Sequence, residues 1–342
     1  MAGLIKVLSI DGGGIRGIIP AIILAEIEER TQKRIAELFD LIAGTSTGGI
    51  LALGLTKPGI DNKTPEYAAR DLVKFYEKEG QKIFPSSVFN QVRSLFDEKY
   101  PAKDIESILA KYLGEARLSD ALKEVLIPSY EIELRQPYFF KSTKAKNPQK
   151  RNKCNFKMKD VARATSAAPT YFEPLHLETP DKLDSYAFID GGVFANNPAM
   201  CAYVEAKTIF PEATDFLVVS IGTGELAASL SYKDVKDWGL LQWAQPILNV
   251  TFDGISDTVD YQLQQLLSSE NKPQRYFRFQ TQLFALGERG DHIDDASEEH
   301  IRHLKRLAKI ILDKNDKELN RLCNVLDNSR STVPQADMLH TA

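Results

Sequence analysis

The sequence predicts an α/β fold in which helices cover a mainly parallel β-sheet. Residues 4–10 form a short β-branched run, which is followed by a glycine-rich turn and then by isoleucines at helical spacing. The same order recurs at once, because residues 39–43 have the pattern of a buried strand, 44–49 of a turn and 50–55 of a helix. Two successive strand–turn–helix units are typical of a parallel sheet with helices on its faces.

The remaining elements follow from periodicity along the chain. Amphipathic spacing predicts helices over 65–80 and 104–112, a helix of small residues over 160–168 that Pro169 ends, and mostly helical structure over 235–267 and 300–326. Strands are predicted over 123–130, 137–141, 186–189 and 215–221. Residues 1–328 therefore form one predicted domain whose part from about 226 is helical, and the polar segment 329–342 is a predicted flexible tail.

Composition excludes several classes of function. The chain has 342 residues, of which 43% are hydrophobic and 26% charged, as in ordinary globular proteins. A net charge of −4 gives no overall attraction to nucleic acid. The three cysteines form no Cys-x-x-Cys pair and the five histidines show no metal spacing, so no metal or cofactor is predicted. His300 and His303 are expected on one exposed helix face.

The sequence shows neither an export signal nor an apolar run long enough to span a membrane. A cytoplasmic location is therefore predicted, with any membrane contact being peripheral.

A candidate nucleophile lies in the second strand–turn–helix unit. The segment Gly44-Thr45-Ser46-Thr47-Gly48 matches G-x-S-x-G between a predicted strand and a predicted helix. Small flanking residues allow a sharp turn that projects the serine hydroxyl, and the helix N-terminus favours developing negative charge. The alternative is an ordinary glycine-rich turn.

The first turn, Asp11-Gly12-Gly13-Gly14-Ile15-Arg16-Gly17, can expose backbone amides that stabilise an oxyanion. Arg16 could hold this loop or attract an anionic head group, or it could be a solvated surface residue. The turn also contains G-x-G-x-x-G, which suggests a dinucleotide-dependent oxidoreductase as an alternative. That fold needs an acid at the end of the second strand, whereas Asp40 lies at its beginning and Glu37 earlier still.

A candidate general base follows a later strand. Asp190-Gly191-Gly192 comes directly after residues 186–189, which would bring a carboxylate to a strand end, where catalytic groups lie in α/β sheets. A plain turn is the alternative. The next residues, Asn196-Asn197-Pro198, are predicted to cap a helix.

Four motifs, in this order along the chain, resemble the patatin-like phospholipase family: the glycine loop from Asp11, Gly44 to Gly49, the run from Ala162 to Pro169, and Asp190-Gly191-Gly192. The resemblance covers about residues 4–225 and implies a three-layer α/β/α sandwich and calcium-independent release of fatty acids from phospholipids or other acyl glycerides. It implies a catalytic dyad of Ser46 and Asp190. The implied oxyanion hole comprises Gly12, Gly13, Gly14 and Thr47, with supporting residues Arg16, Gly44, Gly48 and Gly191. A non-catalytic storage or lipid-binding protein of the same fold is a further alternative.

Two segments and one histidine remain. Residues 141–159 hold eight Lys or Arg residues and no acid, so they could contact anionic lipid or form a solvated loop. Residues 238–250 contain both tryptophans among apolar residues, and core packing is favoured there over a membrane interface or an acyl pocket. A serine–histidine–aspartate triad would use His292, which ranks below the dyad.

Overall fold

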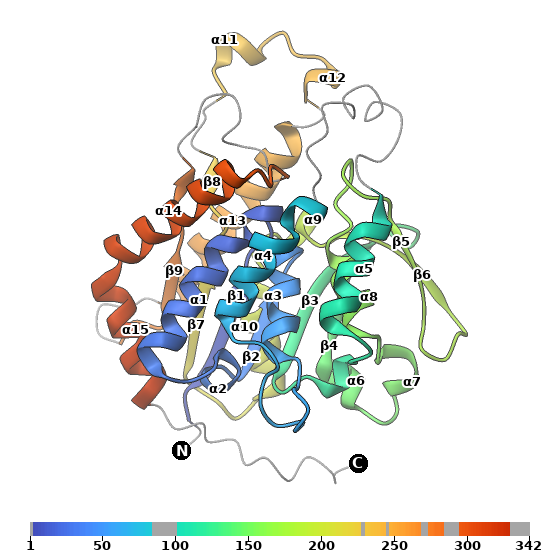
Figure 1. Cartoon of the computed structure of the whole chain (residues 1–342), viewed down its shortest axis with the longest axis vertical. Helices are drawn as coiled ribbons and strands as arrows, with labels where there is room; N and C mark the ends of the chain where they lie inside the picture. Colours follow the sequence, from blue (N-terminus) through green and yellow to red (C-terminus); the bar gives the residue numbers. More distant parts are fainter. Residues whose placement is uncertain are drawn as a thin grey trace.

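The computed structural model describes residues 3–83, 101–226, 230–243, 246–267, 273–283 and 294–328 (Figure 1). Its centre is an eight-stranded sheet with the strand order β5-β6-β3-β2-β1-β7-β9, in which β4 pairs with β3. The strands are β1 (Ile5–Ile10), β2 (Leu41–Gly44), β3 (Glu124–Glu131), β4 (Gln136–Lys141), β5 (Leu175–Glu178), β6 (Ser185–Asp190), β7 (Phe216–Ile221) and β9 (Tyr276–Phe279).

The middle of the sheet is parallel and one side is antiparallel. Strand β1 runs parallel to β2 and β7, β2 runs parallel to β3, and β7 runs parallel to β9. Strands β4 and β6 are antiparallel to β3, and β5 is antiparallel to β6. Both predicted strand–turn–helix units lie in the parallel part, so the loops after β1 and β2 emerge at the same edge of the sheet.

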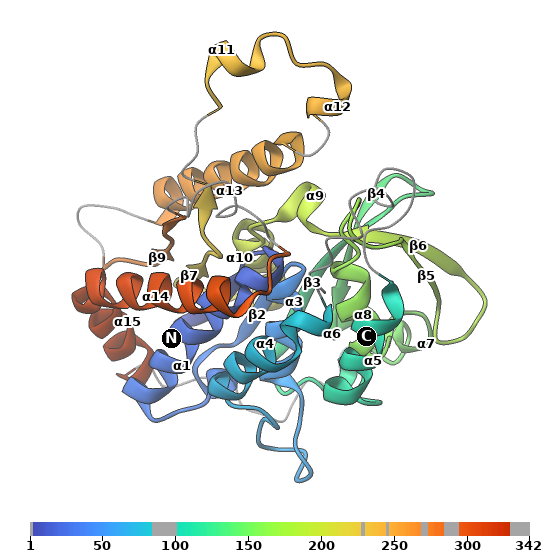
Figure 2. The same ribbon diagram turned by 45° about the horizontal axis from the view of Figure 1, so that its top comes forward.

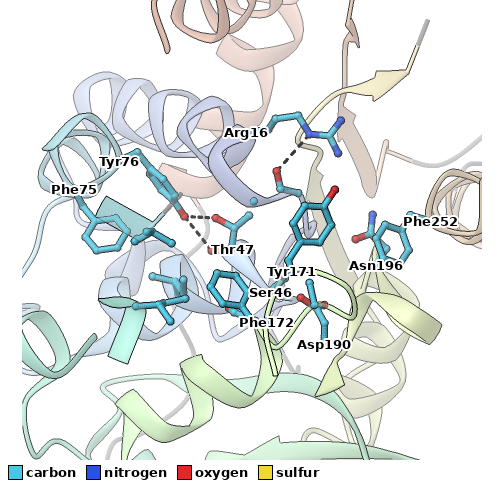
Figure 3. Close-up of a pocket in the computed structure, with 17 residues that line it drawn as sticks. Arg16, Ser46, Thr47, Phe75, Tyr76, Tyr171, Phe172, Asp190, Asn196 and Phe252 are labelled. Atoms are coloured by element: carbon cyan, nitrogen blue, oxygen red, sulfur yellow. Dashed lines mark hydrogen bonds between the residues drawn. The ribbon is translucent and has the colours of Figure 1, made fainter. Parts of the chain in front are cut away.

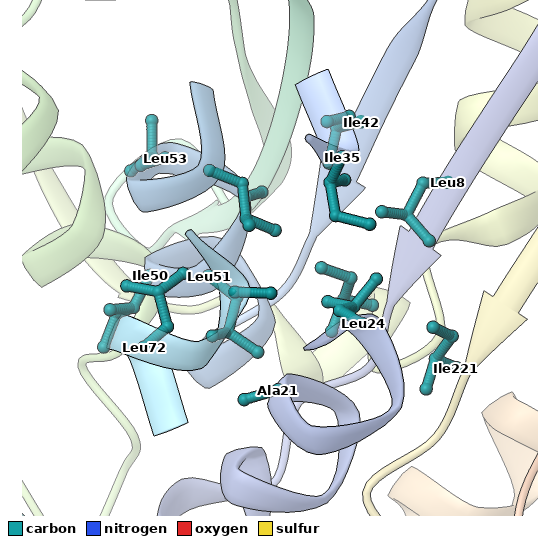
Figure 4. Close-up of a cluster of buried hydrophobic side chains, with 14 of the residues drawn as sticks. Leu8, Ala21, Leu24, Ile35, Ile42, Ile50, Leu51, Leu53, Leu72 and Ile221 are labelled. Carbon is teal, nitrogen blue, oxygen red and sulfur yellow. The ribbon is translucent and has the colours of Figure 1, made fainter. Parts of the chain in front are cut away.

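Helices cover both faces of the sheet, which confirms the three-layer α/β/α prediction. One face packs against α1 (Ile18–Thr31), α3 (Thr47–Thr56), α4 (Ala69–Ile83), α14 (Glu298–Lys314) and α15 (Asp316–Asn328). The other face packs against α10 (Ala199–Ile209) and α13 (Pro246–Leu267). Within β1, Leu8 and Ile10 face the first cluster, whereas Ile5 and Val7 face the second, as the alternation of a strand requires. Part of the first cluster is drawn in Figure 4.

Shorter elements surround these layers. They are α2 (Ile35–Leu38), α5 (Ala102–Leu113), α6 (Ser142–Lys146), α7 (Arg151–Cys154), α8 (Met158–Thr165), α9 (Gly192–Ala195), α11 (Tyr232–Val235), α12 (Leu240–Trp243), and the pair β8 (Glu225–Leu226) and β10 (Gln282–Leu283). Helices α11 and α12 stand away from the body of the molecule, beyond α13 (Figures 1 and 2). No helix in the described ranges has the length and apolarity needed to cross a membrane.

Most predicted elements are present, with shifted ends. The helix expected over 65–80 spans Ala69–Ile83, and the one expected over 160–168 spans Met158–Thr165. Strands β5 and β9 were not predicted, and β9 lies in the part expected to be helical. The predicted tail, 329–342, lies outside the described residues.

Two predictions about surface and core were wrong. His300, in the first turn of α14, is buried because it lies on the same helix face as Ile301 and Leu304, which pack into the core. Core packing was favoured for residues 238–250, but Leu240, Ile247 and Val250 are exposed.

Candidate active site

Ser46 lies in a sharp turn between β2 and α3. Its backbone has φ 54° and ψ −122°, a left-handed φ that is uncommon for any residue except glycine and typical of a nucleophile elbow. The turn needs glycine on both sides, because a Cβ on Gly44 would lie 2.0 Å from the Gly48 carbonyl oxygen and one on Gly48 would lie 2.2 Å from that of Ile10. The hydroxyl of Ser46 therefore projects beside the N-terminus of α3.

Asp190 ends β6 and points to Ser46 (Figure 3). Asp190 is 3% exposed, lines the same pocket as Ser46, and accepts the N–H of Gly192 at 2.7 Å through Oδ1. Burial raises the pKa of Asp190 to about 6, although the neighbouring Ser46 side chain and the Gly192 N–H oppose the shift. A carboxylate with that pKa is a better proton acceptor than an ordinary aspartate and is still ionised at neutral pH.

Thr165 joins the serine turn to the aspartate turn. Its hydroxyl accepts the N–H of Ser46 at 3.0 Å and donates to the carbonyl of Pro128 at 2.5 Å. Its own carbonyl accepts the N–H of Gly191 at 3.3 Å, and the carbonyl of Ala167 accepts the N–H of Asp190 at 2.9 Å. The run from Ala162 to Pro169 thus fixes Ser46 and Asp190 relative to each other.

The glycine loop after β1 lines the same site through Gly13 and Gly14. The amides of Gly13, Gly14 and Thr47 donate to no acceptor in the described part of the chain, so they are available to an oxyanion. Gly12 differs from the prediction, because its N–H donates to the carbonyl of Asn196 at 3.1 Å. Position 12 has no room for a side chain, because a Cβ there would lie 2.5 Å from Oδ1 of Asn196.

Asn196 is a site residue that the sequence reasoning assigned only to a helix cap. It lines the pocket and holds the glycine loop through its carbonyl. Its neighbour Asn197 does have a capping role, because its Oδ1 accepts the N–H of Ala199 at 3.1 Å. Only the folded chain brings Asn196 beside Gly12, so no local signal could have found it.

Arg16 is buried and lines the pocket, which excludes the solvated-surface interpretation. Its Nε donates to the carbonyl of Gly13 at 3.3 Å (Figure 3), so the guanidinium supports the glycine loop that lines the pocket with Ser46. On α13, the carboxyl of Asp253 is half buried, and its raised pKa reflects burial that Arg16 partly offsets.

Tyr76, from α4, is a second pocket residue that the sequence reasoning missed. Its hydroxyl shares a hydrogen bond with the Thr47 hydroxyl and donates to the Thr47 carbonyl at 3.2 Å. Burial raises its pKa well above the ordinary value, so the phenol stays neutral. Tyr76 therefore positions the residue that follows the nucleophile.

The pocket has one polar end, and the rest of its lining is apolar. Ser46, Asp190, Asn196 and Arg16 gather at the polar end, and Phe252 of α13 lies beside Asn196 (Figure 3). Apolar residues from several helices and loops line the rest: Ile50, Phe75, Ile83, Ile105, Ala168 and Phe172. An apolar pocket beside the Ser46 hydroxyl suits the acyl part of a lipid ester.

No histidine among the described residues lines this pocket. His292, the candidate for a triad, lies outside the described residues. Within the described ranges no group of His, Cys, Asp or Glu side chains has the arrangement of a metal site. The strand β2 ends in Gly44 and leads into Thr45 and Ser46, so the acid that a dinucleotide site would need at that point is missing.

Comparison with known proteins agrees with this geometry. The family model described as patatin-like phospholipase matches residues 8–203. Patatin-like protein 2 of Oryza sativa subsp. indica is 36% identical over 91% of this chain and 84% of its own length. Patatin-like protein 4 of Arabidopsis thaliana is 34% identical over 93% of this chain and 85% of its own. A Solanum tuberosum relative named probable inactive patatin-3-Kuras 1 is 35% identical over 93% of this chain and 88% of its own length.

Proposed function

Because the chain belongs to the patatin-like phospholipase family, we propose that it is a serine lipid acyl hydrolase that releases fatty acids from phospholipids or other acyl glycerides. Membership of this family supports the hydrolysis of lipids. One observation gives the main support for a mechanism in which Ser46 is the nucleophile and Asp190 the base. The Ser46 side chain and a buried carboxylate, Asp190, lie together at the polar end of an apolar pocket. That pair combines a nucleophile with a proton acceptor whose pKa is close to neutral.

The first step forms an acyl-enzyme. Oγ of Ser46 attacks the ester carbonyl carbon while its proton moves to Asp190, and the carbonyl oxygen becomes an oxyanion. The amides of Gly13, Gly14 and Thr47, together with the N-terminus of α3, stabilise that charge. The carbon–oxygen ester bond then breaks, and the departing alcohol takes the proton from Asp190.

The second step releases the fatty acid. Water attacks the acyl-enzyme carbonyl and gives a proton to Asp190, the oxyanion forms again, and its collapse returns the proton to Oγ of Ser46. The acyl chain occupies the apolar part of the pocket during both steps. The proposal uses neither calcium nor histidine, because the base and the oxyanion donors all come from the residues named above.

Labelling and two substitutions test this proposal. We expect a fluorophosphonate to label Ser46 and Ser46→Ala to abolish hydrolysis of a soluble p-nitrophenyl acyl ester. Asp190→Asn keeps the shape and removes the base, so kcat should fall by about 10²–10⁴-fold. Asp184→Asn, which changes a surface carboxylate next to the same strand, is the matched control and should retain full activity.

Two results would contradict the proposal. If His292→Ala, rather than Asp190→Asn, removes activity, a triad replaces the dyad. If wild-type protein binds lipid but fails to turn over any activated ester, the chain is a non-catalytic member of the family, as the name of the Solanum tuberosum relative indicates for that protein.

A further inference from the structure

Exposed apolar side chains concentrate on one short part of the chain, the described residues of 230–250, which we call the apical arm. Thirteen large hydrophobic residues are exposed among the described residues, and five of them belong to this arm: Leu230, Tyr232, Leu240, Ile247 and Val250. Leu240 is 92% exposed and Tyr232 is 79% exposed. Single exposed apolar residues need no explanation, but a group of this kind indicates a contact surface.

The arm also carries both tryptophans of the chain. Trp238 and Trp243 are half buried and pack edge to face, with their ring centroids 5.3 Å apart. Tryptophan and tyrosine favour the boundary between lipid and water, because their rings are apolar and each has a polar group. The composition of the arm therefore fits a lipid surface better than an aqueous one.

The position of the arm connects it to the active site. Helices α11 and α12 stand above the body, and α13 lies between them and the rest of the molecule (Figures 1 and 2). In the first turns of α13, Ile247 and Val250 face outward, while Phe252 lines the pocket that contains Ser46. A helix places residues two apart on opposite sides, so α13 separates the arm's outer surface from the pocket.

The charges of the arm suit a zwitterionic surface. Residues 230–243 contain two cations, Lys233 and Lys236, and two acids, Asp234 and Asp237, so they carry no net charge. Nζ of Lys236 lies 3.7 Å from the Asp237 carboxylate. Binding through this surface would depend on apolar insertion and little on salt.

The basic segment 141–159 is a weaker candidate for membrane contact. Five of its eight cations form ion pairs with acids from other parts of the chain: Lys141 with Glu205, Lys146 with Glu124, Lys153 with Asp184, and Lys157 and Lys159 with Glu115. Helices α6 and α7 of this segment lie at the opposite end of the molecule from α11 and α12 (Figure 1). Most of the positive charge of this segment is therefore compensated, and the segment lies far from the arm.

We propose that the apical arm docks the protein onto a zwitterionic lipid surface and thereby brings the pocket to the membrane from which its substrate comes. This inference rests on the proposed function for the reason to bind lipid. The docking itself needs no catalysis.

Vesicle binding by an inactive chain tests the docking separately from hydrolysis. The full chain carrying Ser46→Ala is mixed with phosphatidylcholine vesicles, and the bound fraction is measured by flotation. We expect Leu240→Asp to weaken binding by about tenfold, because a charge replaces an apolar side chain at the surface that enters the lipid. Leu183→Asp is the matched control, since Leu183 is 77% exposed on the turn between β5 and β6, and it should bind as before.

Hydrolysis by the active chain supplies a second measurement. Leu240→Asp should keep wild-type activity on a soluble ester and lose about tenfold on vesicles, because it changes only access to the membrane. Raising salt from about 0.05 M to about 0.5 M should leave vesicle binding nearly unchanged, because the arm has no net charge to be screened.

Several outcomes would overturn the docking proposal. Equal binding by the Leu240→Asp and Leu183→Asp variants would exclude the arm. Binding that requires anionic lipid and disappears at high salt would assign the contact to the basic segment instead. If sedimentation shows that Leu240→Asp separates a dimer while vesicle binding is unchanged, the arm binds a second copy of the chain. Vesicle binding that depends on Leu240, without hydrolysis of any ester, would support docking and contradict the proposed function alone.

Discussion

At the scale of single residues, the burial of Asp190 lowers the stability of the folded chain. The carboxylate loses more solvation than the Gly192 N–H and the neighbouring Ser46 side chain restore, so folding raises its affinity for a proton. The same burial brings its pKa to about 6, close to the pH at which a general base is most effective. The chain therefore holds an ionised Asp190 at neutral pH at the expense of folding free energy.

Asp190→Asn should consequently stabilise the fold while removing activity. The folded pKa lies above the ordinary 3.8, so the folded state binds more protons than the unfolded state between about pH 4 and pH 6, and stability falls as pH rises through this window. The difference in pKa corresponds to at most about 3 kcal/mol at pH 7. Asparagine has no such cost, so urea unfolding should show a more stable variant at pH 7 and near equality at pH 4.

Asp184→Asn provides the comparison, because that carboxylate is exposed and paired with Lys153 at the surface. It should change the free energy of unfolding by less than about 1 kcal/mol at either pH. A variant Asp190→Asn that is equally or less stable at pH 7 would mean that the carboxylate is better solvated, or better bonded, than its burial indicates.

At the scale of elements, strand β9, which was not predicted, helps to hold the glycine loop in place. Strand β7 lies between β9 and β1, and a side chain of β9 reaches the residue that follows β1. Arg278 of β9 donates from Nη2 to Oδ2 of Asp11 at 2.7 Å and from Nη1 to the Ser220 hydroxyl at 2.8 Å. Asp11 is 1% exposed and is the last residue before the glycines. The carbonyl of Gly12 then accepts the hydroxyl of Thr223, at the end of β7, at 2.6 Å. Residues far apart in the chain thus fix the loop.

Arg278→Met should destabilise the protein strongly, because it leaves the buried Asp11 carboxylate without its counter-ion. Breaking a buried ion pair from one side costs about 3–5 kcal/mol, and urea unfolding would measure the loss. Adding Asp11→Asn removes the charge as well, so the double variant should recover a large part of that stability. Arg275→Met is the matched control, because Arg275 pairs with Asp215 at a more exposed position and its loss should cost about 1 kcal/mol or less. If Arg278→Met and Arg275→Met lower the free energy of unfolding equally, the buried ion pair between Arg278 and Asp11 stabilises the fold no more than the surface pair does.

The sequence predicted the elements whose signals are local. The runs that became β1, β2 and β7 are mostly apolar, with Lys6, Ser9 and Ser220 as the polar exceptions, because both faces of these strands are buried, and each is followed by a turn that contains glycine. Strands β5 and β9 lie at the two edges of the sheet, where Leu175–Glu178 alternates with polar residues and Tyr276–Phe279 contains Arg278, so neither has the continuous apolar run of β2. The positions of Ser46 and Asp190, each at or just after the end of a strand, could be predicted for the same local reason.

The residues that support the site have no local signal. Tyr76 lies on an ordinary amphipathic helix, and only the packing of α4 against the start of α3 brings its hydroxyl to Thr47. Asn196 acts through its backbone carbonyl, which any residue possesses. Such contacts depend on the three-dimensional arrangement of segments far apart in sequence, so residue type and spacing could not predict them.

At the scale of the whole molecule, the C-terminal helices belong to the same core as the catalytic elements. The family match ends at residue 203, yet Leu304 and Leu322 are fully buried in the cluster that also contains Ile18, Leu24 and Ile50. Ion pairs join α1 to α15 at the surface, including Arg30 Nη1 with Asp316 Oδ1 at 2.9 Å. From this continuity we propose that residues 1–328 form one domain.

Leu322→Ala tests whether α15 and the active site unfold together. The substitution removes a fully buried side chain from the core and should lower the free energy of unfolding by about 2–5 kcal/mol. Because one core connects the helices to β1 and α3, circular dichroism and loss of ester hydrolysis should report the same lowered urea midpoint, as two-state unfolding requires. Ile310→Ala, on the partly exposed side of α14, is the control and should cost less than about 1 kcal/mol. If activity instead survives to the wild-type midpoint while part of the helical signal is lost earlier, α14 and α15 unfold independently and the domain ends before them.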